Sequence, residues 1–499
     1  MVLLSELVAS LGGTVDAPAP PGDASPAIRD VHVDSRRVAE GTLFAALPGR
    51  ATDGARHVPD ATRRGAVAVL APERLAQAPE IACWIHPEAR RVAGLAAAVV
   101  YGRPTADVPV IGITGTNGKT TVAHLMGDVL THLGHRPAVL GTVGHRLWGA
   151  FVEATHTTPD ATELQRLCRR HRELGGDAVV LEISSHALDQ ERAAGLELSV
   201  AVWTNLSHDH LDYHVSMDAY AAAKERIFAL LRPDGTAVVN ADDALAPRMI
   251  RAAEGRGARV VTFGIGSRAD LRVSRMEEDR QGTRLFLEGM GVPRTGLYLP
   301  LVGRHNVENA LATLVAILSL GASPSRVLEG LATVTPPPGR LEPIDTGVRG
   351  FRVFVDYAHT PQALERVLST LRDLLSEGAE SKQGRLVCVF GCGGERDRDK
   401  RAVMGSIVAS LADVCVVTSD NPRGEDPEAI LQEVQAGMAE PRGEVVAEVD
   451  RRAAIRAALH RAQPGDLVLI AGKGHEAWQQ LSNQRVPFDD RLVAAEELP

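Results

Sequence analysis

The sequence predicts an α/β protein with three domains, and its length, composition and hydrophobic pattern all support this prediction. At 499 residues the chain exceeds the size at which one hydrophobic core stays efficient, so roughly two to four domains are expected. Apolar residues make up 44% of the chain and aromatic residues only 4%, so small aliphatic side chains must fill the cores. Short β-branched runs recur with helical stretches between them, which is typical of parallel sheets with crossover helices.

Two segments with the character of linkers set the expected domain boundaries. The first lies at residues 101–109, and the second is the run PPPGRLE at 336–342. We therefore predict a small N-terminal α/β domain at 1–105, a central domain with a mostly parallel sheet at 106–338, and a C-terminal domain at 339–499.

The N-terminal domain is expected to begin with a helix, because the apolar residues of MVLLSELVASL have helical spacing. Short strands should follow around 28–34, 42–46 and 66–70. The run VDSRRV between the first two is the least ordinary piece of this domain. A surface loop is the simplest interpretation of its residues Asp34, Ser35 and Arg36.

The central domain is organised around residues 108–133, which read VPVIGITGTNGKTTVAHLMGDVLTHL. The first half predicts a buried strand, and the apolar residues of the second half predict a helix that stops near Gly134. A glycine-rich turn between them directs backbone N–H groups and the positive end of the helix dipole at one point, so an anion can bind there. Phosphate is the natural ligand: Lys119 would reach the outer phosphates, and the Thr120 hydroxyl would complete the shell of a Mg²⁺ ion bound to them.

This turn departs from the strict P-loop pattern at one position. The pattern has a glycine five residues before Gly118, where this chain has Ile113. The GKT run and the flanking strand and helix are intact, so we prefer phosphate binding to a merely structural turn. The central domain is therefore predicted to resemble a P-loop ATPase.

Further buried strands are expected at 178–184, 198–206, 236–240 and 258–264, then an antiparallel excursion at 268–300 and a helix at about 306–320. Polar residues follow the first two strands: Ser184, Ser185 and His186 after VVLEI, and His208, Asp209, His210 and Asp212 after VAVWTNL. Ligands bind beyond the carboxyl ends of the strands in such sheets, so both groups should lie on the same side as the P-loop. Glu182 and His210 are candidate metal ligands, although each alone could be an ordinary hydrogen-bonded polar residue.

The last third of the chain repeats strand then helix, which predicts a doubly wound, Rossmann-like domain. Its strands are expected in RVFVDYAH, RLVCVFGCGG, VCVVTSDNPR, EVVAEVD and LVLIAGKGHE. No G-x-G-x-x-G run opens a helix after the first strand, so dinucleotide binding is disfavoured. We interpret the glycines at 391–394 as a loop that lets a ligand approach closely.

Charge and cysteine usage exclude several classes of protein. The net charge is −9 and the basic clusters are short, which argues against a nucleic-acid surface. The five cysteines are scattered without a C-x-x-C pair, so a disulfide framework or zinc site is not expected and a reducing compartment fits. Because Glu6 interrupts the apolar N-terminus and no 18-residue apolar stretch occurs, we expect a soluble cytoplasmic protein without a signal peptide or membrane partner.

Ten motifs occur in one order along the chain: TGTNGKTT, EISSHAL, TNLSHDHLDYH, AAAKERIF, GRHNVENALA, PGRLE, VDYAHTP, FGCGGERD, SDNPR and AGKGHE. In this order the chain resembles the Mur ligases of peptidoglycan synthesis, and within them the ligase that adds the third residue of the stem peptide. The resemblance covers nearly the whole chain, including VDSRRV.

The resemblance implies an ATP-dependent amide ligase of cell wall synthesis, and so of cell shape and division, with Mg²⁺ as cofactor and ATP as co-substrate. One domain would bind the UDP end of the substrate, the central one ATP, and the last the incoming amino acid. The γ-phosphoryl group would pass to the D-glutamate side chain of UDP-N-acetylmuramoyl-L-alanyl-D-glutamate, and an amine of meso-diaminopimelate would attack the acyl-phosphate. A carboxylate is a poor electrophile until its oxygen becomes a good leaving group, so catalysis would be positioning plus charge neutralisation. We expect a monomer whose partners are these small molecules.

The resemblance also implies roles for individual residues. The ATP-binding set is Gly115, Thr116, Asn117, Gly118, Lys119, Thr120, Thr121, Asn306, Arg340 and Asp356. The metal set is Thr120, Glu182, His210 and Lys224 as a carbamate, and the catalytic set is Lys119, Glu182, His210, Lys224 and Arg340. The UDP-substrate set is Val33, Ser35, Arg50, Ala51, Thr52, Asp53, His156, Thr157, Thr158, Ser184, Gln190 and Arg192. The diaminopimelate set is Arg396, Asp420, Asn421, Pro422, Arg423, Gly472 and Glu476.

Two of these residues depart from the simplest interpretation of their surroundings or from the family pattern. Judged from the residues alone, Lys224 is a lysine in the middle of a helix, and such lysines are usually solvated. His156 stands where relatives often have Asn before the paired threonines.

The run DNPR at 420–423 bears on which amino acid is used, because in this family it accompanies meso-diaminopimelate and lysine-adding relatives lack the arginine. Diaminopimelate carries a second carboxylate where lysine has hydrogen, and a guanidinium can bind a carboxylate through two parallel hydrogen bonds. The alternative interpretation of DNPR is an ordinary turn before a helix at Pro427.

Three alternative functions are weighed against this one. An L-lysine-adding homologue would use the same chemistry. A folylpolyglutamate synthetase-like ligase shares the P-loop variant, but VDSRRV, DNPR and GKGHE argue against a pterin substrate. A P-loop nucleotide switch, outside the ligases, would need a hydrophobic partner surface and would leave the polar C-terminal loops unused.

Overall fold

The structure is a computed structural model. It describes residues 1–16, 25–49, 53–75, 80–266, 268–279, 281–294, 296–376 and 384–499, with only the backbone of Asp212. The chain divides into two compact units. Unit 1 comprises Met1–Val273, Leu287–Arg294 and Glu308–Leu331, and unit 2 comprises Ser274–Phe286, Thr295–Val307 and Ala332–Pro499.

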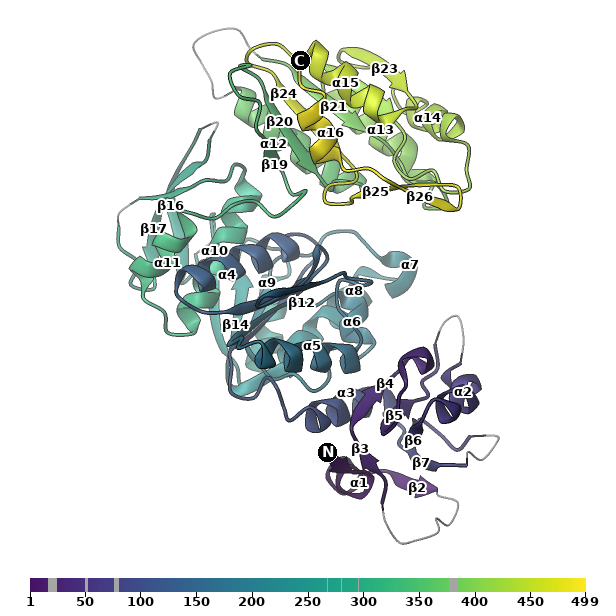
Figure 1. Ribbon diagram of the computed structural model, residues 1–499. Coiled ribbons are helices and arrows are strands. Elements are labelled where there is room, and N and C mark those ends of the chain that lie inside the picture. Colours follow the sequence, from purple (N-terminus) through teal and green to yellow (C-terminus); the bar gives the residue numbers. More distant parts are fainter. Residues whose placement is uncertain are drawn as a thin grey trace. The chain divides into compact units, whose positions relative to one another are not determined.

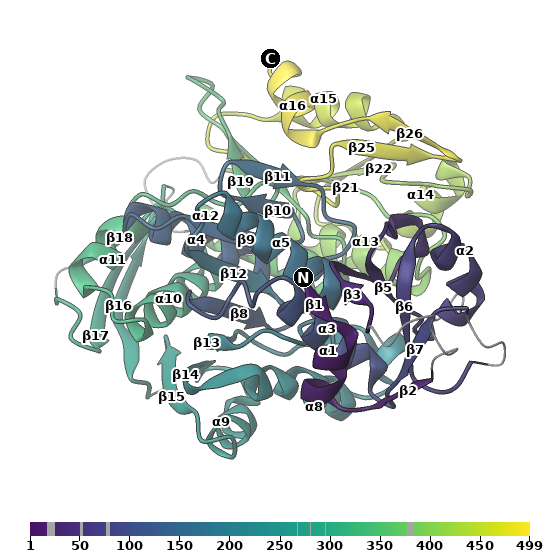
Figure 2. The same cartoon turned by 60° about the horizontal axis from the view of Figure 1, so that its bottom comes forward.

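The N-terminal part of unit 1 is a five-stranded sheet in which only the β2–β7 pair is antiparallel. Its order is β2 (Thr14–Asp16), β7 (Ala82–Ile85), β6 (Ala66–Ala71), β5 (Thr42–Ala45) and β4 (Asp30–His32). Alternate residues of β5 face opposite sides. Leu43 and Ala45 pack with α1 (Leu4–Leu11) and α3 (Ala89–Val100), whereas Phe44 packs with α2 (Val58–Arg63). Helices α1 and α3 accordingly lie on one face of this sheet and α2 on the other (Figures 1 and 2).

Four shorter elements complete this part of unit 1. They are β1 (Val2–Leu3), β3 (Ala27–Ile28), η1 (Ser35–Arg37) and η2 (Gly54–His57). β1 and β3 pair with each other in antiparallel fashion. The expected helix at the N-terminus is confirmed as α1, and η1 contains the run SRR of the VDSRRV motif.

The central sheet has eleven strands in the order β11-β10-β9-β12-β8-β13-β14-β15-β16-β17-β18. The pairs from β9 to β16 are parallel, and β11, β10 and β18 join by antiparallel pairing. Every residue of β8, β9, β12 and β13 is buried, as is usual for strands covered on both faces. The strand bounds are β8 (Val110–Thr114), β9 (Pro137–Gly141), β10 (Gly144–Leu147), β11 (Ala150–Val152), β12 (Ala178–Glu182), β13 (Leu198–Trp203), β14 (Leu231–Asn240), β15 (Arg259–Gly264), β16 (Leu271–Glu278), β17 (Thr283–Gly289) and β18 (Leu297–Leu299).

Helices cover both faces of this sheet, with α4 and α5 on opposite faces (Figure 1). The helix bounds are α4 (Lys119–His132), α5 (Ala161–Glu173), α6 (Ser185–Asp189), α7 (Leu211–His214), α8 (Met217–Glu225), η3 (Arg226–Leu230), α9 (Ala246–Glu254), α10 (Arg304–Ser319) and α11 (Pro324–Leu331). In the parallel register Glu182 lies beside Ile113 and Trp203 beside Thr114. The polar residues that follow β12 and β13 therefore lie beside the P-loop, as the sequence predicted.

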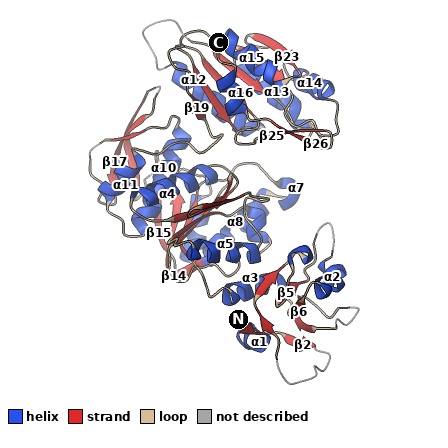
Figure 3. Cartoon of the chain, viewed as in Figure 1, coloured by secondary structure: helices blue, strands red, loops and turns tan. Residues whose placement is uncertain are grey.

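The C-terminal part of unit 2 is a six-stranded sheet with helices on both faces (Figure 3). Its order is β19 (Glu342–Ile344), β20 (Arg352–Asp356), β24 (Leu467–Ala471), β21 (Leu386–Phe390), β22 (Val414–Thr418) and β23 (Glu444–Glu448). Only β19 pairs antiparallel. One core includes residues of α12 (Pro361–Ser376), α13 (Asp399–Leu411) and α14 (Pro427–Gln435), and the other includes residues of α15 (Arg451–Arg461) and α16 (Asp490–Glu496).

The predicted α/β class is confirmed, and so are the strand and helix around the P-loop and the five strands predicted for the C-terminal domain. The sequence reasoning missed β2, β7, the run β9 to β11, and the hairpin β25 (Trp478–Leu481) and β26 (Gln484–Pro487). Most of these are short, so their residues give little periodic signal. The predicted domain boundaries stay a prediction. Among the described residues, no helix has both the length and the apolar character needed to span a bilayer.

Candidate functional site

The P-loop joins β8 to α4 through a turn that only glycine can form. Gly115 and Gly118 have φ of +149° and +88°, a region that L side chains avoid. A Cβ at Gly115 would lie 1.9 Å from Oγ1 of Thr204, and one at Gly118 would lie 2.5 Å from Oδ1 of Asn309. The two glycines therefore shape a tight turn at the N-terminus of α4, the positive end of the helix dipole, where the sequence predicts that an anion binds.

Residues after β13 hold this turn in place. The backbone N–H of Asn117 donates to Oδ1 of Asn205 at 3.0 Å, and Thr204 Oγ1 donates to the Asn117 carbonyl at 2.6 Å. Lys119 Nζ donates to the carbonyls of Gly115 and Thr116 at 2.9 and 2.8 Å. The lysine charge is thus placed at the turn itself, where phosphate would bind.

Hydroxyl and carboxylate oxygens gather beside the first turn of α4. Thr120 Oγ1 donates to Oε2 of Glu182 at 2.9 Å, and Thr142 donates to the same carboxylate from its N–H at 2.9 Å and its hydroxyl at 3.1 Å. Thr157 Oγ1 lies 3.1 Å from Thr142 Oγ1. Glu182 is only 1% exposed. Oxygen donors of this kind suit Mg²⁺, so the residues present fit the predicted ion.

Lys224 is buried against the P-loop and not solvated as its place in a helix would suggest. Its Nζ donates to the Gly115 carbonyl at 2.6 Å and lies 4.8 Å from the ring centroid of Tyr220. Burial, together with the charge of Lys119, lowers the pKa of Lys224 well below its ordinary value. Only an uncharged amine reacts with CO₂, losing a proton to give a carbamate, so the position suits that prediction, which stays a prediction.

His210 lies in a group of aromatic rings at the start of α7. Its ring is 4.8 Å from that of His186 and 6.0 Å from that of Tyr220, whose hydroxyl is 3.2 Å from Thr116 Oγ1 in the P-loop. The backbone of His210 is left-handed, with φ of +53°. The part of the chain that the structure describes contains no cluster of three or more His, Cys, Asp or Glu with metal-binding geometry. The predicted metal ligands include Thr120 and Lys224, which are not among these residue types. The absence of such a cluster therefore does not test the predicted metal site, which stays a prediction.

A cavity of about 810 Å³ lies between the N-terminal part of unit 1 and helix α5. Four of the predicted UDP-substrate residues line it: Val33, His156, Gln190 and Arg192. The lining also includes arginines that the sequence reasoning did not assign: Arg36, Arg37, Arg90 and Arg166. Guanidinium groups bind phosphate oxygens through paired hydrogen bonds, so the cavity suits the diphosphate of a nucleoside diphosphate.

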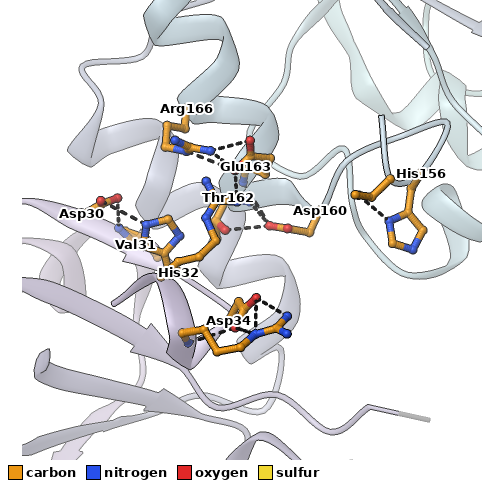
Figure 4. A network of polar contacts seen from close by, with 12 residues as sticks. Asp30, Val31, His32, Asp34, His156, Asp160, Thr162, Glu163 and Arg166 are labelled. Carbon is orange, nitrogen blue, oxygen red and sulfur yellow. Dashed lines mark hydrogen bonds and ion pairs between the residues drawn. The ribbon is translucent and has the colours of Figure 1, made fainter. Parts of the chain in front are cut away.

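Glu163 contacts two of these arginines, and Figure 4 shows its hydrogen bonds with Arg166. Glu163 of α5 accepts from Arg166 on the same helix, and Arg37 of η1 reaches it across the cavity at 2.6 Å. Burial raises the pKa of Glu163, although Arg37 opposes this effect. At the neighbouring strand β4, His32 pairs with Asp30 at 3.2 Å. The contact between Arg37 and Glu163 thus joins the N-terminal part of unit 1 to helix α5.

A line of hydrogen bonds connects the cavity to the oxygen cluster around Glu182. Arg192 Nη1 donates to the Thr158 carbonyl at 3.2 Å, and Thr158 Oγ1 donates to the Glu182 carbonyl at 2.8 Å. The N–H of Ser184 donates to Thr158 Oγ1 at 3.1 Å. The predicted residues Thr158 and Ser184 therefore lie between the cavity and the P-loop side of the sheet.

The remaining predicted residues of this set fall outside the cavity lining. Ser35 is buried in η1, and Asp53 caps η2 by accepting from the N–H of Ala55. His156, which does line the cavity and stands in place of the usual Asn, has Nδ1 3.2 Å from Thr155 Oγ1, and burial together with Arg192 lowers its pKa. Arg50, Ala51 and Thr52 lie outside the described residues.

Unit 2 carries the other predicted nucleotide residues. Asp356 ends β20 and accepts from the N–H groups of Leu341 and Ala358 at 2.7 and 2.8 Å. Burial raises the pKa of Asp356, although Arg340 opposes this effect. Arg340 lies over the Tyr357 ring at 4.9 Å, and Asn306 Nδ2 donates to the Val302 carbonyl at 2.9 Å. Arg340 and Asp356 are thus brought together, as the sequence prediction requires.

The DNPR run follows β22 and is bound to the loop that follows β24. Lys473 is fully buried, and its Nζ donates to Asn421 Oδ1 at 3.2 Å, Glu476 Oε2 at 3.1 Å and the Trp478 carbonyl at 2.6 Å. Asn421 Nδ2 donates to the same Glu476 oxygen at 2.9 Å. Among the described residues Glu476 Oε1 accepts no hydrogen bond, so this oxygen can meet an ammonium group.

Arg423 occupies a strained backbone position, with φ of +52°. Its Nη1 donates to the Gly394 carbonyl at 2.7 Å, and a Cβ at Gly393 would lie 2.9 Å from that nitrogen and 3.8 Å from Cγ of Arg396. The glycines at 393–394 thus leave space for Arg423 and bring Arg396 near it. A Cβ at Gly472 would lie 2.7 Å from Oδ2 of Asp420, so the loops after β22 and β24 also pack closely.

Sequence reasoning missed Lys473, Arg37 and Arg166 as parts of these sites. Lys473 is the lysine of GKGHE and contacts residues 52 positions away, so no local spacing shows its partners. Arg37 lies in VDSRRV, where only its proximity to Ser35 could have indicated a role. Arg166 belongs to the basic face of an ordinary amphipathic helix.

Comparisons with known proteins follow the same order along the chain. Three family models match: "Mur ligase family, catalytic domain" at residues 27–100, "Mur ligase middle domain" at 113–317 and "Mur ligase, glutamate ligase domain" at 339–474.

The chain is also similar to individual ligases over almost its full length. It is 43% identical over 483 residues to the UDP-N-acetylmuramoyl-L-alanyl-D-glutamate–2,6-diaminopimelate ligase of Chromobacterium violaceum, with 94% of each chain covered. It is 42% identical to the ligase of the same name from Syntrophomonas wolfei, again with 94% of each covered. A solved structure of a ligase of that name is 33% identical with a TM-score of 0.72, and the match covers 100% of this chain and 98% of that one.

Proposed function

The chain belongs to the Mur ligase family, and we propose that it is the ATP-dependent ligase that joins meso-diaminopimelate to UDP-N-acetylmuramoyl-L-alanyl-D-glutamate. The reaction would form an amide at the D-glutamate side-chain carboxylate in cytoplasmic peptidoglycan precursor synthesis. The observation that carries the proposal is the 43% identity to a relative of that name over 94% of both chains. In this proposal the P-loop of unit 1 would bind the ATP phosphates, and the DNPR loop of unit 2 would bind the incoming amino acid.

The P-loop would hold the ATP phosphates through its backbone N–H groups, and Lys119 would neutralise charge on the outer phosphates. An oxygen of the substrate carboxylate attacks the γ-phosphorus, and the bond to the β–γ bridging oxygen breaks to release ADP. The product is an acyl-phosphate, whose phosphate is a good leaving group. Placement of the carboxylate in line with the γ-phosphorus is then the main contribution of the protein.

Thr120, Glu182, His210 and a carbamate on Lys224 are proposed to hold Mg²⁺, which would neutralise phosphate charge when bound. Thr142 and Thr157 fix Glu182 in the oxygen cluster described above. Because Thr158 joins this cluster to Arg192, a substrate whose diphosphate lies in the cavity could extend its peptide toward the P-loop.

The loops of unit 2 would bind the amino acid. Arg423 and Arg396 would bind its carboxylates, and Glu476 Oε1 would accept a hydrogen bond from its distal ammonium group. The other amine, uncharged, attacks the acyl carbon; the resulting tetrahedral intermediate loses phosphate, and the nitrogen loses a proton to give the amide. A guanidinium placed for the second carboxylate would be left unpaired by lysine, so lysine should be rejected.

The decisive experiment measures ADP and phosphate release with each substrate omitted in turn, and identifies the product by mass spectrometry. A ligase of this kind requires ATP, the UDP-dipeptide and meso-diaminopimelate together, and yields the tripeptide nucleotide. Equal use of L-lysine would overturn the choice of amino acid. Phosphate release from ATP alone, at the full rate, would point to the nucleotide switch.

A further inference from the structure

Arg451 and Asp490 form an ion pair in which both side chains are completely buried. Arg451 is the first residue of α15, and Asp490 is the first residue of α16. Nε of the arginine donates to Oδ1 of the aspartate at 2.8 Å, and Nη2 donates to Oδ2 at 2.7 Å. The carboxylate therefore fixes the plane of the guanidinium group.

The same guanidinium also donates to the main chain at the carboxyl ends of two strands, directly after β22 and at the last residue of β24. Nη1 donates to the carbonyl of Ser419 at 3.2 Å, and Nη2 donates to the carbonyl of Ala471 at 3.0 Å. Ser419 is the residue before the DNPR run, and Ala471 is the residue before Gly472. One buried cation thus holds the backbone just below both loops that are proposed to bind the amino acid.

The geometry requires arginine and could not be supplied by another cation. A guanidinium is planar and has five N–H donors at fixed angles on three nitrogens. A lysine ammonium has three donors on one nitrogen, so it cannot bind both oxygens of a carboxylate and two separate carbonyls at the same time. Burial by itself would lower the pKa of Arg451, but the charge and hydrogen bonds of Asp490 outweigh it and raise that pKa. The buried group therefore stays a cation with its charge balanced.

Small displacements of the two loops would change the binding groups above them. Asn421 and Glu476 are hydrogen-bonded to each other at 2.9 Å across the loops, and Gly472 leaves no spare room beside Asp420. A shift of about 1 Å in the spacing of groups that must contact one small molecule can lower binding or rate by a large factor.

We propose that Arg451, held in place by Asp490, is a positioning residue that sets the spacing between the loops 420–423 and 472–476, and thereby the recognition of the amino-acid substrate. The inference rests on the proposed function for the identity of that substrate. Arg451 is too deeply buried to touch the substrate, so its effect passes through the backbone of Ser419 and Ala471.

The test compares this pair with a second ion pair, which lies at the opposite end of strand β24. Arg385 and Asp466 form a two-nitrogen contact at 3.1 and 2.8 Å where β21 and β24 begin. Asp466 is 3% exposed and Arg385 36%, so the control pair also secures the sheet but lies away from the loops. The variants are Arg451→Lys and Asp490→Asn, with Arg385→Lys and Asp466→Asn as matched controls.

For each variant, KM is measured separately for meso-diaminopimelate, the UDP-dipeptide and ATP. The assay temperature is kept well below the Tm of that variant, so that the protein is folded. We expect Arg451→Lys and Asp490→Asn to raise KM for meso-diaminopimelate about ten-fold or more and to leave the other two KM values within about two-fold. The controls should lower Tm without a selective change in KM. An unchanged KM for meso-diaminopimelate in folded Arg451→Lys, or an equal rise in Arg385→Lys, would refute the positioning role.

Amide hydrogen exchange provides a readout that does not depend on activity. In Arg451→Lys and Asp490→Asn the amides at 420–423 and 472–476 should exchange faster than in the wild type, while those of β20 keep their rates. A uniform increase over the whole of unit 2 would indicate a purely structural role. If wild type shows no diaminopimelate-dependent ADP formation, the proposed function fails, and the exchange rates still decide whether Arg451 sets the two loops.

Discussion

The P-loop of unit 1 and the paired loops of unit 2 both present charged groups at the carboxyl ends of parallel strands, but they are held in different ways. The P-loop is shaped largely by its own glycines, and Lys119 contacts carbonyls three and four residues away. The loops of unit 2 are joined by Lys473, which reaches Asn421 over 52 positions, and by Arg451, which reaches Ser419 and Ala471 over 32 and 20 positions. The predicted phosphate-binding turn is therefore one continuous segment, which Thr204 and Asn205 hold in place, whereas the proposed amino-acid site is formed by two loops that are distant in the sequence.

The charges differ in the same way. Lys119 and Lys224 lie close enough that one lowers the pKa of the other, which is favourable only where an anion is to bind. In unit 2 the buried cations already have carboxylate partners, Asp490 for Arg451 and Glu476 for Lys473. The first region is prepared for a ligand with high negative charge, and the second has a neutralised framework that leaves Arg423 for recognition.

The largest effect is expected from Lys119→Ala. Removal of the ammonium group should lower kcat by about 10²–10³-fold, because this group would neutralise the charge that develops on the transferred phosphoryl group. Binding of the UDP-dipeptide, measured by calorimetry, should be unchanged, since the cavity lining does not include Lys119. Normal turnover in this variant would show that the turn is only structural.

Lys224→Ala should lower activity about 100-fold, because the proposed carbamate would be lost as a metal ligand. Short-chain carboxylates should restore part of the activity by supplying the missing anion. Labelling with ¹³CO₂ should give a carbamate signal in wild type that is absent from the variant. The control is Lys400→Ala, whose ammonium group donates to the His359 carbonyl, and carboxylates should not affect it. Full activity of Lys224→Ala would show that Lys224 supplies no metal ligand.

Arg423→Ala tests the recognition role of unit 2. We expect kcat/KM for meso-diaminopimelate to fall about 30-fold or more, and the preference over L-lysine to shrink by a similar factor, because the lost guanidinium pairs only with the second carboxylate. Kinetics with both amino acids in wild type and variant give the two ratios. If the ratio does not change, Arg423 does not select the substrate.

The smallest effect is expected from Arg37→Ala in the cavity of unit 1. The side chain is 39% exposed, so its contact with Glu163 is screened by solvent and contributes little. KM for the UDP-dipeptide should rise about three-fold while KM for meso-diaminopimelate stays constant. Arg63→Ala, which removes an exposed pair with Asp60 outside the cavity lining, is the control and should change neither value. A rise in KM for meso-diaminopimelate would mean that the two regions are not independent.

The sequence by itself determined the parts of this protein that depend on neighbouring residues. The alternation of β-branched runs with helical stretches gave the α/β class, and the GKT run between a strand and a helix located the P-loop. Periodicity and glycine placement act over a few residues, so they can be read without tertiary information. The short strands β9 to β11 escaped detection because their burial comes from the neighbouring strands of the sheet.

Only the tertiary structure decided which distant residues share a site. Burial of Lys224 against the Gly115 carbonyl could not be inferred from a lysine in a helix, because 109 positions separate the two. The same holds for the contact of Arg37 with Glu163 and for the buried pair of Arg451 and Asp490. The physical reason is that a charge becomes worth burying only when its partners are assembled around it, and packing of the sheets brings those partners together.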